Sequence, residues 1–158
     1  MADNKEKYAF ENYKLVCKVL DELEINYKKD DERLSASFLY QDVDGEKYIP
    51  DFYINARQQL IVLNVYPEFK IRDDNILPVA IAVCQINYGV VDGYFDLNVA
   101  EGDIAFKMTS NFWDSLLSGE VIKQMLMVGI NTAKDWFATI KKISDGELDV
   151  NVFLFSED

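Results

Sequence analysis

The sequence predicts an α+β fold, an antiparallel sheet of about five strands with helices packed on it, in the order α-β-β-β-α-β-β-α. Two observations lead to this class. Apolar residues recur every three to four positions in three long segments, and every second position in several short ones. The short segments follow one another in the chain, which favours hairpins over parallel crossovers. No repeat, low-complexity segment or linker interrupts the 158 residues, so we expect a single domain over residues 1–158.

The first half of the chain is predicted to form one helix and three strands. The helix covers about residues 8–23, because apolar residues recur there on one face only. This face consists of Ala9, Tyr13, Val16, Leu20 and Leu23. Residues 34–40 then alternate between apolar and polar, and strands over residues 48–55 and 60–66 follow after turns. Pro50 has no backbone N–H, so we expect it at a strand start or on a sheet edge.

The middle helix, predicted over residues 76–88, is apolar nearly all round. Pro78 near its start and Gly89 just after it are typical of helix boundaries. One stripe consists of Val79, Val83, Ile86 and Val90, and a second consists of Leu77, Ile81, Cys84 and Tyr88. A helix of this kind is buried on two sides. The sheet can cover one stripe, so we expect the second to contact the first helix, the C-terminal tail or a partner.

A hairpin and a long helix complete the predicted fold. The hairpin strands cover residues 94–100 and 104–110. The last helix begins after Ser118. Its expected buried stripe consists of Ile122, Leu126, Gly129, Ala133, Trp136, Phe137 and Ile140. The glycine in this stripe indicates close backbone packing. The tail at residues 150–155 is expected to add a short strand or to dock on the surface.

Composition limits the classes of function. The chain has 16 Lys and Arg, 28 Asp and Glu and no His, giving a net charge of −12. Without His, the commonest general base and the commonest metal ligand are missing. The negative charge is spread evenly along the chain and repels phosphate backbones, so we expect no nucleic-acid partner. A basic protein partner is compatible with this surface.

Catalytic and cofactor motifs do not occur in the sequence. Glycine-rich phosphate loops, a nucleophile elbow and a C-x-x-C pair are missing. Cys17 and Cys84 lie far apart and are interpreted as small buried hydrophobes. The turn at residues 42–45 lacks the ligand spacing of a calcium loop. We therefore expect no catalytic residue, no cofactor and no metal.

The N-terminus carries no apolar run after its charges, and no apolar stretch approaches the roughly 20 residues that span a bilayer. We expect a cytoplasmic protein without a membrane partner.

Four stretches of the chain resemble the YbjN family, bacterial proteins described as sensory transduction regulators. They are residues 76–87, 93–99 and 102–107 and the helix at 121–143. The family is similar to the type III secretion chaperone fold, which has the same order of elements. Gly89 stands where many members have a Trp- and Asn-rich helix end. The resemblance implies a dimeric, non-enzymatic binding module and carries over no catalytic residue.

We therefore expect a chaperone-like protein-binding or regulatory module that forms a homodimer or binds a protein partner. The binding residues expected on the middle helix are Leu77, Ile81, Cys84 and Tyr88, and those expected on the open side of the sheet are Tyr66 and Tyr94. One alternative is an acidic immunity-type protein that neutralises a basic toxin or effector. Another is a small enzyme that works through carboxylates and Tyr.

Overall fold

The computed structural model describes residues 2–156, and within them it contains a seven-stranded antiparallel sheet and four α-helices. The helices are α1 (Ala2–Glu22), α2 (Ile76–Gly89), α3 (Gly119–Ser144) and α4 (Val150–Phe155), and a 3-10 turn, η1 (Asp73–Asn75), precedes α2. The strands are β1 (Lys28–Asp30), β2 (Ser35–Ser37), β3 (Tyr40–Gln41), β4 (Lys47–Asn55), β5 (Leu60–Pro67), β6 (Tyr94–Asn98) and β7 (Asp103–Asn111).

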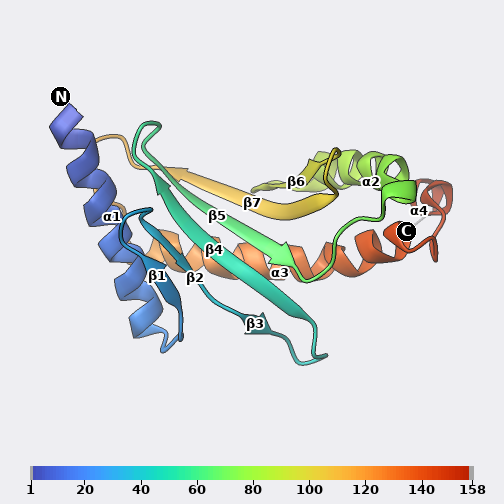
Figure 1. Cartoon of the computed structure of the whole chain (residues 1–158), viewed down its shortest axis with the longest axis horizontal. Helices are drawn as coiled ribbons and strands as arrows, with labels where there is room; N and C mark the ends of the chain where they lie inside the picture. Colours follow the sequence, from blue (N-terminus) through green and yellow to red (C-terminus); the bar gives the residue numbers. More distant parts are fainter. Residues whose placement is uncertain (1, 157–158) are drawn as a thin grey trace.

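The strands lie in the order β1-β2-β4-β5-β7-β6, and β3 also pairs with β4 (Figure 1). Every pairing is antiparallel, so the expected α+β class with an antiparallel sheet is confirmed. The two longest pairings join β4 to β5 and β5 to β7. They make β5 the central strand, as its nearly continuous apolar sequence indicates.

The sheet has more strands than the sequence predicts, for two reasons. The charged residues 28–30 form an exposed edge strand, β1, which apolar alternation could not reveal. The single strand expected over residues 34–40 is divided into β2 and β3. Phe38 donates its N–H to the Pro50 carbonyl at 3.1 Å, but Pro50 has no N–H to return. Contrary to expectation, Pro50 therefore lies inside a non-edge strand, at a gap in its ladder.

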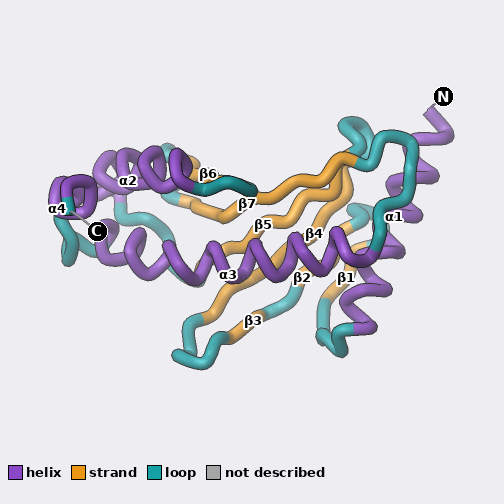
Figure 2. Tube along the Cα trace, turned by 180° about the vertical axis from the view of Figure 1, so that it is seen from behind, coloured by secondary structure: helices purple, strands orange, loops and turns teal. Residues whose placement is uncertain are grey.

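Helices α1, α2 and α3 lie on one face of the sheet (Figure 2). On α1 the expected apolar face is buried, except that Leu23 follows the helix and is exposed. On α3 the expected stripe is also buried, except for Trp136, which is half-buried. Phe137 of α3 packs edge-on against Phe95 and Phe69, with ring centroids 5.3 Å and 6.0 Å away. The main core therefore lies between α3 and the sheet.

The C-terminal tail forms helix α4 and not a strand. The Asp149 side chain accepts a hydrogen bond from the Asn151 N–H at 2.7 Å, which caps the helix. Phe153 packs edge-on against Trp136 of α3, with ring centroids 6.3 Å apart. The tail thus docks on the helical layer, which is the second of its two expected outcomes.

Candidate functional site

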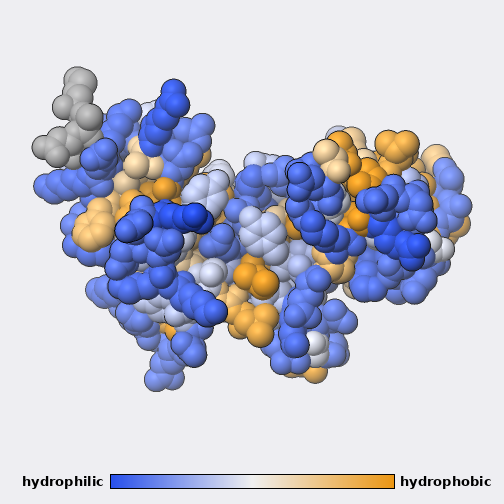
Figure 3. Space-filling model, viewed as in Figure 1, coloured by the Kyte–Doolittle hydropathy of each residue, from blue (hydrophilic) through white to orange (hydrophobic). Residues whose placement is uncertain are grey.

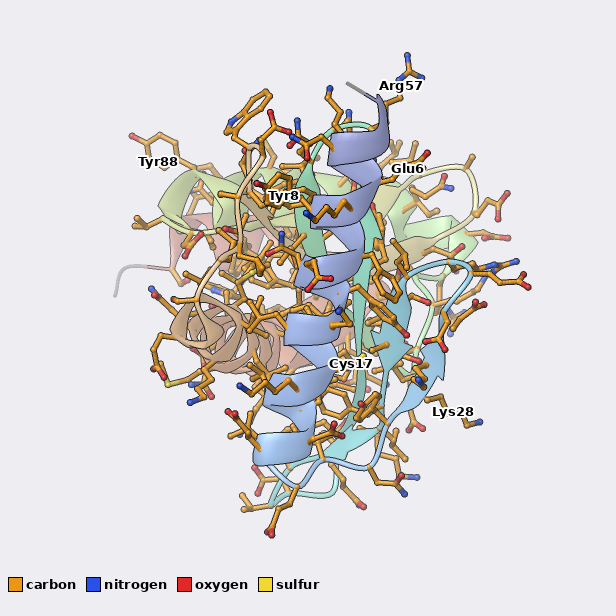
Figure 4. All side chains as sticks on the ribbon, turned by 90° about the vertical axis from the view of Figure 1, so that its left-hand side faces the viewer. Glu6, Tyr8, Cys17, Lys28, Arg57 and Tyr88 are labelled. Atoms are coloured by element: carbon orange, nitrogen blue, oxygen red, sulfur yellow. The ribbon has the colours of Figure 1, made fainter. Side chains whose placement is uncertain are left out.

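Helix α2 buries one apolar stripe and exposes the other. Val79, Val83 and Ile86 are buried against the core. All four residues of the second stripe, Leu77, Ile81, Cys84 and Tyr88, are exposed, with Ile81 at 50% and Tyr88 at 89% of full exposure. Figure 4 shows Tyr88 pointing outward, away from the rest of the molecule. The interpretation of both cysteines as buried hydrophobes is wrong for Cys84, while Cys17 is half-buried.

The exposed face of α2 carries no charge. The helix has 14 residues, and none of them is Asp, Glu, Lys or Arg. In the space-filling view, hydrophobic side chains gather over this helix at the upper right (Figure 3). In a chain with a net charge of −12, an uncharged apolar surface of this length is a marked local exception.

The elements expected to cover this face do not reach it. Helix α1 lies at the opposite end of the sheet from α2 (Figure 1). Helix α4 is next to α2, and Val150 lines a hollow together with Pro78 in the first turn of α2. The remaining described tail residues leave Ile81, Cys84 and Tyr88 exposed. Internal packing within the described chain therefore does not explain the second stripe.

Tyr66 and Tyr94 lie on a different surface from the α2 residues. Side chains alternate along a strand, and the neighbours Val65 and Phe95 point into the core. The side chains of Tyr66 and Tyr94 therefore lie on the outer face of the sheet, which no described helix covers (Figure 2). The six expected binding residues thus form two separate sets.

Asn64 lies at the centre of this outer face. Its direct neighbours across the sheet are Asp51 on β4 and Lys107 on β7, and Lys107 in turn is opposite Tyr94 on β6. Tyr66 is two residues further along β5 and so points to the same side. A hollow of about 340 Å³ is lined by Asn64, Lys107 and Tyr66, among others. Polar, charged and aromatic groups therefore meet at one point of the sheet.

The charges on the outer face are unevenly matched. Lys107 forms an ion pair with Asp96 and also lies over the Tyr94 ring, 5.9 Å from its centroid. The hydrogen bond to Asp96 raises the pKa of the Lys107 ammonium. Asp51 has no such partner among the described residues, and burial alone raises the pKa of its carboxyl. Burial, and then the charge of Asp51, also raise the pKa of Tyr66.

A third surface is a groove of about 670 Å³ between β3, α3 and the turn that follows α1. Leu39 and Met127 line it and are 60% and 61% exposed. The other apolar members are Leu23, Ile25, Phe38, Tyr40, Leu126 and Ile130. Lys123 and three amide side chains are its polar members. The groove is therefore mainly apolar and opens to solvent.

The strand edge beside this groove is open. Phe38 and Asp42 donate their N–H groups toward β4, to the carbonyls of Pro50 and Glu46. Because these groups alternate in direction along a strand, those of Leu39 and Gln41 point away from β4. Strand β1 pairs only with residues 35–37, so no described strand lies beside β3 on that side. The groove thus contains backbone donors and acceptors as well as apolar side chains.

The groove is the surface that sequence reasoning missed. Two signals could have indicated it. Leu39 is apolar at a position where the alternation of residues 34–40 expects a polar residue. Met127 lies outside the buried stripe of α3. Either residue alone is an ordinary exposed hydrophobe, and only the fold brings them together.

Residues 2–156 contain neither a metal-binding cluster nor a membrane-spanning helix. No group of three or more Asp, Glu or Cys side chains there is arranged to hold a metal ion. None of the helices in this part of the chain combines the length and the apolar character needed to cross a bilayer.

Comparisons with known proteins support the fold. No protein-family model matches the chain, and no curated protein matches it. The ExsC–ExsE complex aligns with a TM-score of 0.54 and 12% identity, over 81% of this chain and 92% of that one. The HopA1–SchA chaperone–effector complex aligns with a TM-score of 0.54 and 14% identity, over 83% and 95%.

The third similar structure is that of YbjN, a candidate transcription regulator from E. coli. It aligns with a TM-score of 0.54 and 10% identity, over 91% of this chain and 92% of that one. At these identities the likeness concerns the fold. The resemblance to the YbjN family and to type III secretion chaperones is therefore supported at the level of the fold.

Proposed function

We propose that this chain is a non-catalytic, chaperone-like module of the cytoplasm that binds an extended apolar segment of another protein. The observation that carries this proposal is the groove between β3 and α3, where exposed apolar side chains lie beside an open strand edge. This combination suits a peptide strand that is added to the edge of a sheet.

An open strand edge favours a segment in the extended conformation. A strand added beside β3 would pair with the outward backbone groups of Leu39 and Gln41. Its alternate side chains would then point into the groove toward Leu126, Met127 and Ile130. Backbone pairing supplies affinity that depends little on sequence, and the apolar groove selects segments with hydrophobic residues at every second position.

The proposal also includes a homodimer formed through α2. The helix exposes an apolar face without charges, so two acidic copies can approach there without placing like charges in contact. A symmetric contact between identical faces is the commonest way for a chain to form a dimer. Leu77, Ile81, Cys84 and Tyr88 are the proposed contact residues.

The similar structures support a protein partner. Two of the three are complexes between two proteins, and one of these is named as a chaperone with its effector. The fold is therefore compatible with holding a segment of another chain on its surface.

The reduced B chain of insulin, which is apolar and aggregates when it is released, is a suitable probe. The wild-type protein should delay its aggregation, followed by light scattering, at about equimolar concentration. Leu39→Glu and Met127→Glu should remove the delay, because each places a charge in the apolar groove. Val43→Glu is the matched control, since Val43 is 97% exposed in the β3–β4 turn outside the groove.

Two results would overturn the proposal. If both groove variants delay aggregation as well as the wild type does, the groove is not the binding site. If the wild type gives no delay at a tenfold excess, the chain does not bind apolar segments. Circular dichroism of each variant separates loss of binding from loss of folding.

A second candidate function is neutralisation of a basic toxin or effector. The net charge of −12 favours it, together with the unpaired carboxylate of Asp51. Association of that kind would weaken steeply with added salt, whereas apolar binding in the groove would change little. The salt dependence of any complex therefore distinguishes the two functions.

A further inference from the structure

The buried side chain of Asn64 lacks a hydrogen-bond partner. Asn64 is only 5% exposed, and its Oδ1 is buried without a donor from any described residue. Buried polar atoms are almost always hydrogen-bonded, because an unsatisfied one loses its interaction with water and gains nothing in return. Asn64 Oδ1 is therefore an acceptor that none of residues 2–156 satisfies.

A second acceptor without a partner lies directly across the sheet. Asp51 on β4 is opposite Asn64 on β5, and residues paired in this way have Cβ atoms about 5 Å apart on the same face. Asp51 is about half buried and has no ion-pair partner among residues 2–156. A carboxylate and an amide thus lie side by side on the outer face, and neither the carboxylate nor the amide oxygen accepts a hydrogen bond from a described residue.

The nearest cation in the chain is already used. Lys107 lies on the other side of Asn64, but its ammonium is paired with Asp96. Turning it toward Asn64 would leave the Asp96 carboxylate without a cation. Among Asp51, Asp96 and Lys107 there are two negative charges and one positive charge, so this part of the surface lacks one positive charge.

The aromatic side chains narrow the class of ligand. Tyr53 and Tyr66 line the hollow around Asn64, and Tyr94 is the neighbour of Lys107 across the sheet. Tyrosine rings attract cations over their faces, and they stack best with a planar one. A guanidinium group is planar, stacks on aromatic rings and presents several N–H donors at fixed angles to carboxylates. The ammonium group of lysine carries the same charge but is not planar, so it cannot stack on a ring in this way.

We propose that the outer face of the sheet at Asn64, Asp51 and Tyr66 binds the guanidinium group of an arginine side chain carried by a partner protein. One edge of the guanidinium donates to the Asp51 carboxylate and another N–H donates to the Asn64 amide oxygen. Oδ1 is the buried end of the amide in the structure, so binding turns the side-chain amide by half a turn, which keeps its shape and brings the oxygen to the ligand. The Tyr66 ring covers the plane of the group.

This site is independent of the groove and of the α2 face. Leu63 and Val65 on either side of Asn64 point into the core toward Gly129 of α3, so Asn64 points to the opposite side of the sheet. A failure of the groove experiment would leave this inference standing, and the reverse also holds.

The experiment uses two five-residue peptides with blocked ends, Gly-Gly-Arg-Gly-Gly and the same peptide with citrulline in place of Arg. Citrulline has nearly the shape of Arg but no charge. Each peptide is titrated into the ¹⁵N-labelled full chain, and the side-chain amide signals of Asn64 are followed by NMR. We expect the Arg peptide to shift these signals in a saturable way, and the citrulline peptide to bind at least tenfold more weakly.

Two variants with the same change of charge locate the site. Asp51→Asn should weaken binding of the Arg peptide by about tenfold, because it removes the charge-assisted hydrogen bonds. Asp135→Asn is the matched control, since Asp135 is exposed on α3 on the other side of the sheet. It should leave binding unchanged within about twofold.

Three outcomes would overturn the inference. Equal effects of Asp51→Asn and Asp135→Asn would mean that the peptide responds only to net charge. Equal binding of the Arg and citrulline peptides would mean that no guanidinium is recognised. Asn64 signals that respond to neither peptide but shift in Lys107→Met would mean that Lys107 supplies the missing donor from within the chain.

Discussion

Gly129 of α3 lies so close to Leu63 of β5 that a Cβ atom on the glycine would stand 2.9 Å from Leu63 Cδ2. The same atom would lie 3.4 Å from Met108 Sδ. All three residues are buried, and the close approach lets α3 lie directly on the centre of the sheet. The glycine therefore sets the distance between the two layers.

Gly129→Ala should destabilise the protein. Alanine favours a helix over glycine by about 1 kcal/mol, but a methyl group forced into a packed core costs about 1–3 kcal/mol. Leu63 is fully buried and has little room to move, so we expect a net loss of about 1 kcal/mol in urea unfolding. Gly89→Ala is the control, because nothing lies within 4 Å of its added methyl group. A Gly129→Ala protein as stable as the wild type would show that Leu63 repacks freely.

Asn12 connects α1 to the loop between β7 and α3. Its Nδ2 donates to the carbonyls of Tyr8 and Ser115 at 2.8 Å and 2.9 Å, and its Oδ1 accepts from the Leu117 N–H at 3.0 Å. Asn12 itself is fully buried. Asn12→Leu should lower the free energy of unfolding by about 2 kcal/mol, because it leaves buried backbone groups unpaired.

The control for Asn12 lies on the same helix. Asn4 is exposed, so Asn4→Leu should change the free energy of unfolding by less than about 0.5 kcal/mol. Equal effects of the two variants would contradict a specific role for the three hydrogen bonds. Thermal unfolding followed by circular dichroism is sufficient to compare them.

The fold could be predicted from the sequence wherever apolar periodicity was strong. The helical stripes of residues 8–23 and 122–140 and the alternation at 94–98 each correspond to an element of the structure. Strand β1 and helix α4 could not be predicted in this way. The first is charged and exposed, and its pairing with β2 comes from tertiary contacts; the second is a short apolar run in which periodicity does not distinguish helix from strand.

Of the candidate surfaces, one could be predicted from the sequence and two could not. The second apolar stripe of α2 could be predicted from helical spacing alone, because all its residues lie on a single element. The groove and the Asn64 site each combine residues from segments far apart in the chain. Asp51 and Lys107 carry no sequence signal of their own, and only the strand register places them on either side of Asn64.

Asp51 should make stability fall as the pH rises. Burial raises the pKa of its carboxyl above the ordinary value of 3.8, so the folded state binds the proton more tightly than the unfolded state. Between the ordinary and the raised value the folded state therefore loses stability with increasing pH. Asp51→Asn should be more stable than the wild type at pH 7, by less than about 1 kcal/mol because water still screens the group. The difference should vanish below pH 3.8.

Asp31 should have the opposite effect on the pH dependence of stability. The Tyr13 hydroxyl donates to Asp31 Oδ1 at 2.7 Å, and this hydrogen bond lowers the pKa of the Asp31 carboxyl. Asp31→Asn should therefore be less stable than the wild type at pH 7, and its deficit should shrink as acid protonates the wild-type carboxylate. Urea unfolding at several pH values measures both variants. If both variants changed the stability at pH 7 in the same direction, the environments assigned to the two carboxyl groups would be wrong. An Asp51→Asn protein that is more stable but no longer binds the Arg peptide would show that the site is kept at a cost in stability.

The exposed face of α2 should make the chain a dimer. Static light scattering should give twice the mass of one chain at both low and high salt, because the proposed interface is apolar and lacks charges. Ile81→Asp should shift the mass to that of a monomer, since it would bury an unpaired carboxylate in the contact. Val43→Asp is the control, because Val43 is an exposed apolar residue outside α2, and it should leave the mass unchanged.

The thiol of Cys84 gives an independent reading of the same interface. In a Cys17→Ala background Cys84 is the only cysteine, and it lies on the exposed face of α2. Its alkylation should slow as the protein concentration rises through the dissociation constant of the dimer, and Ile81→Asp should restore fast alkylation at all concentrations. A wild-type protein that stays monomeric at high concentration, with Cys84 always reactive, would exclude the homodimer. The uncharged face of α2 would then be a second surface for a partner protein.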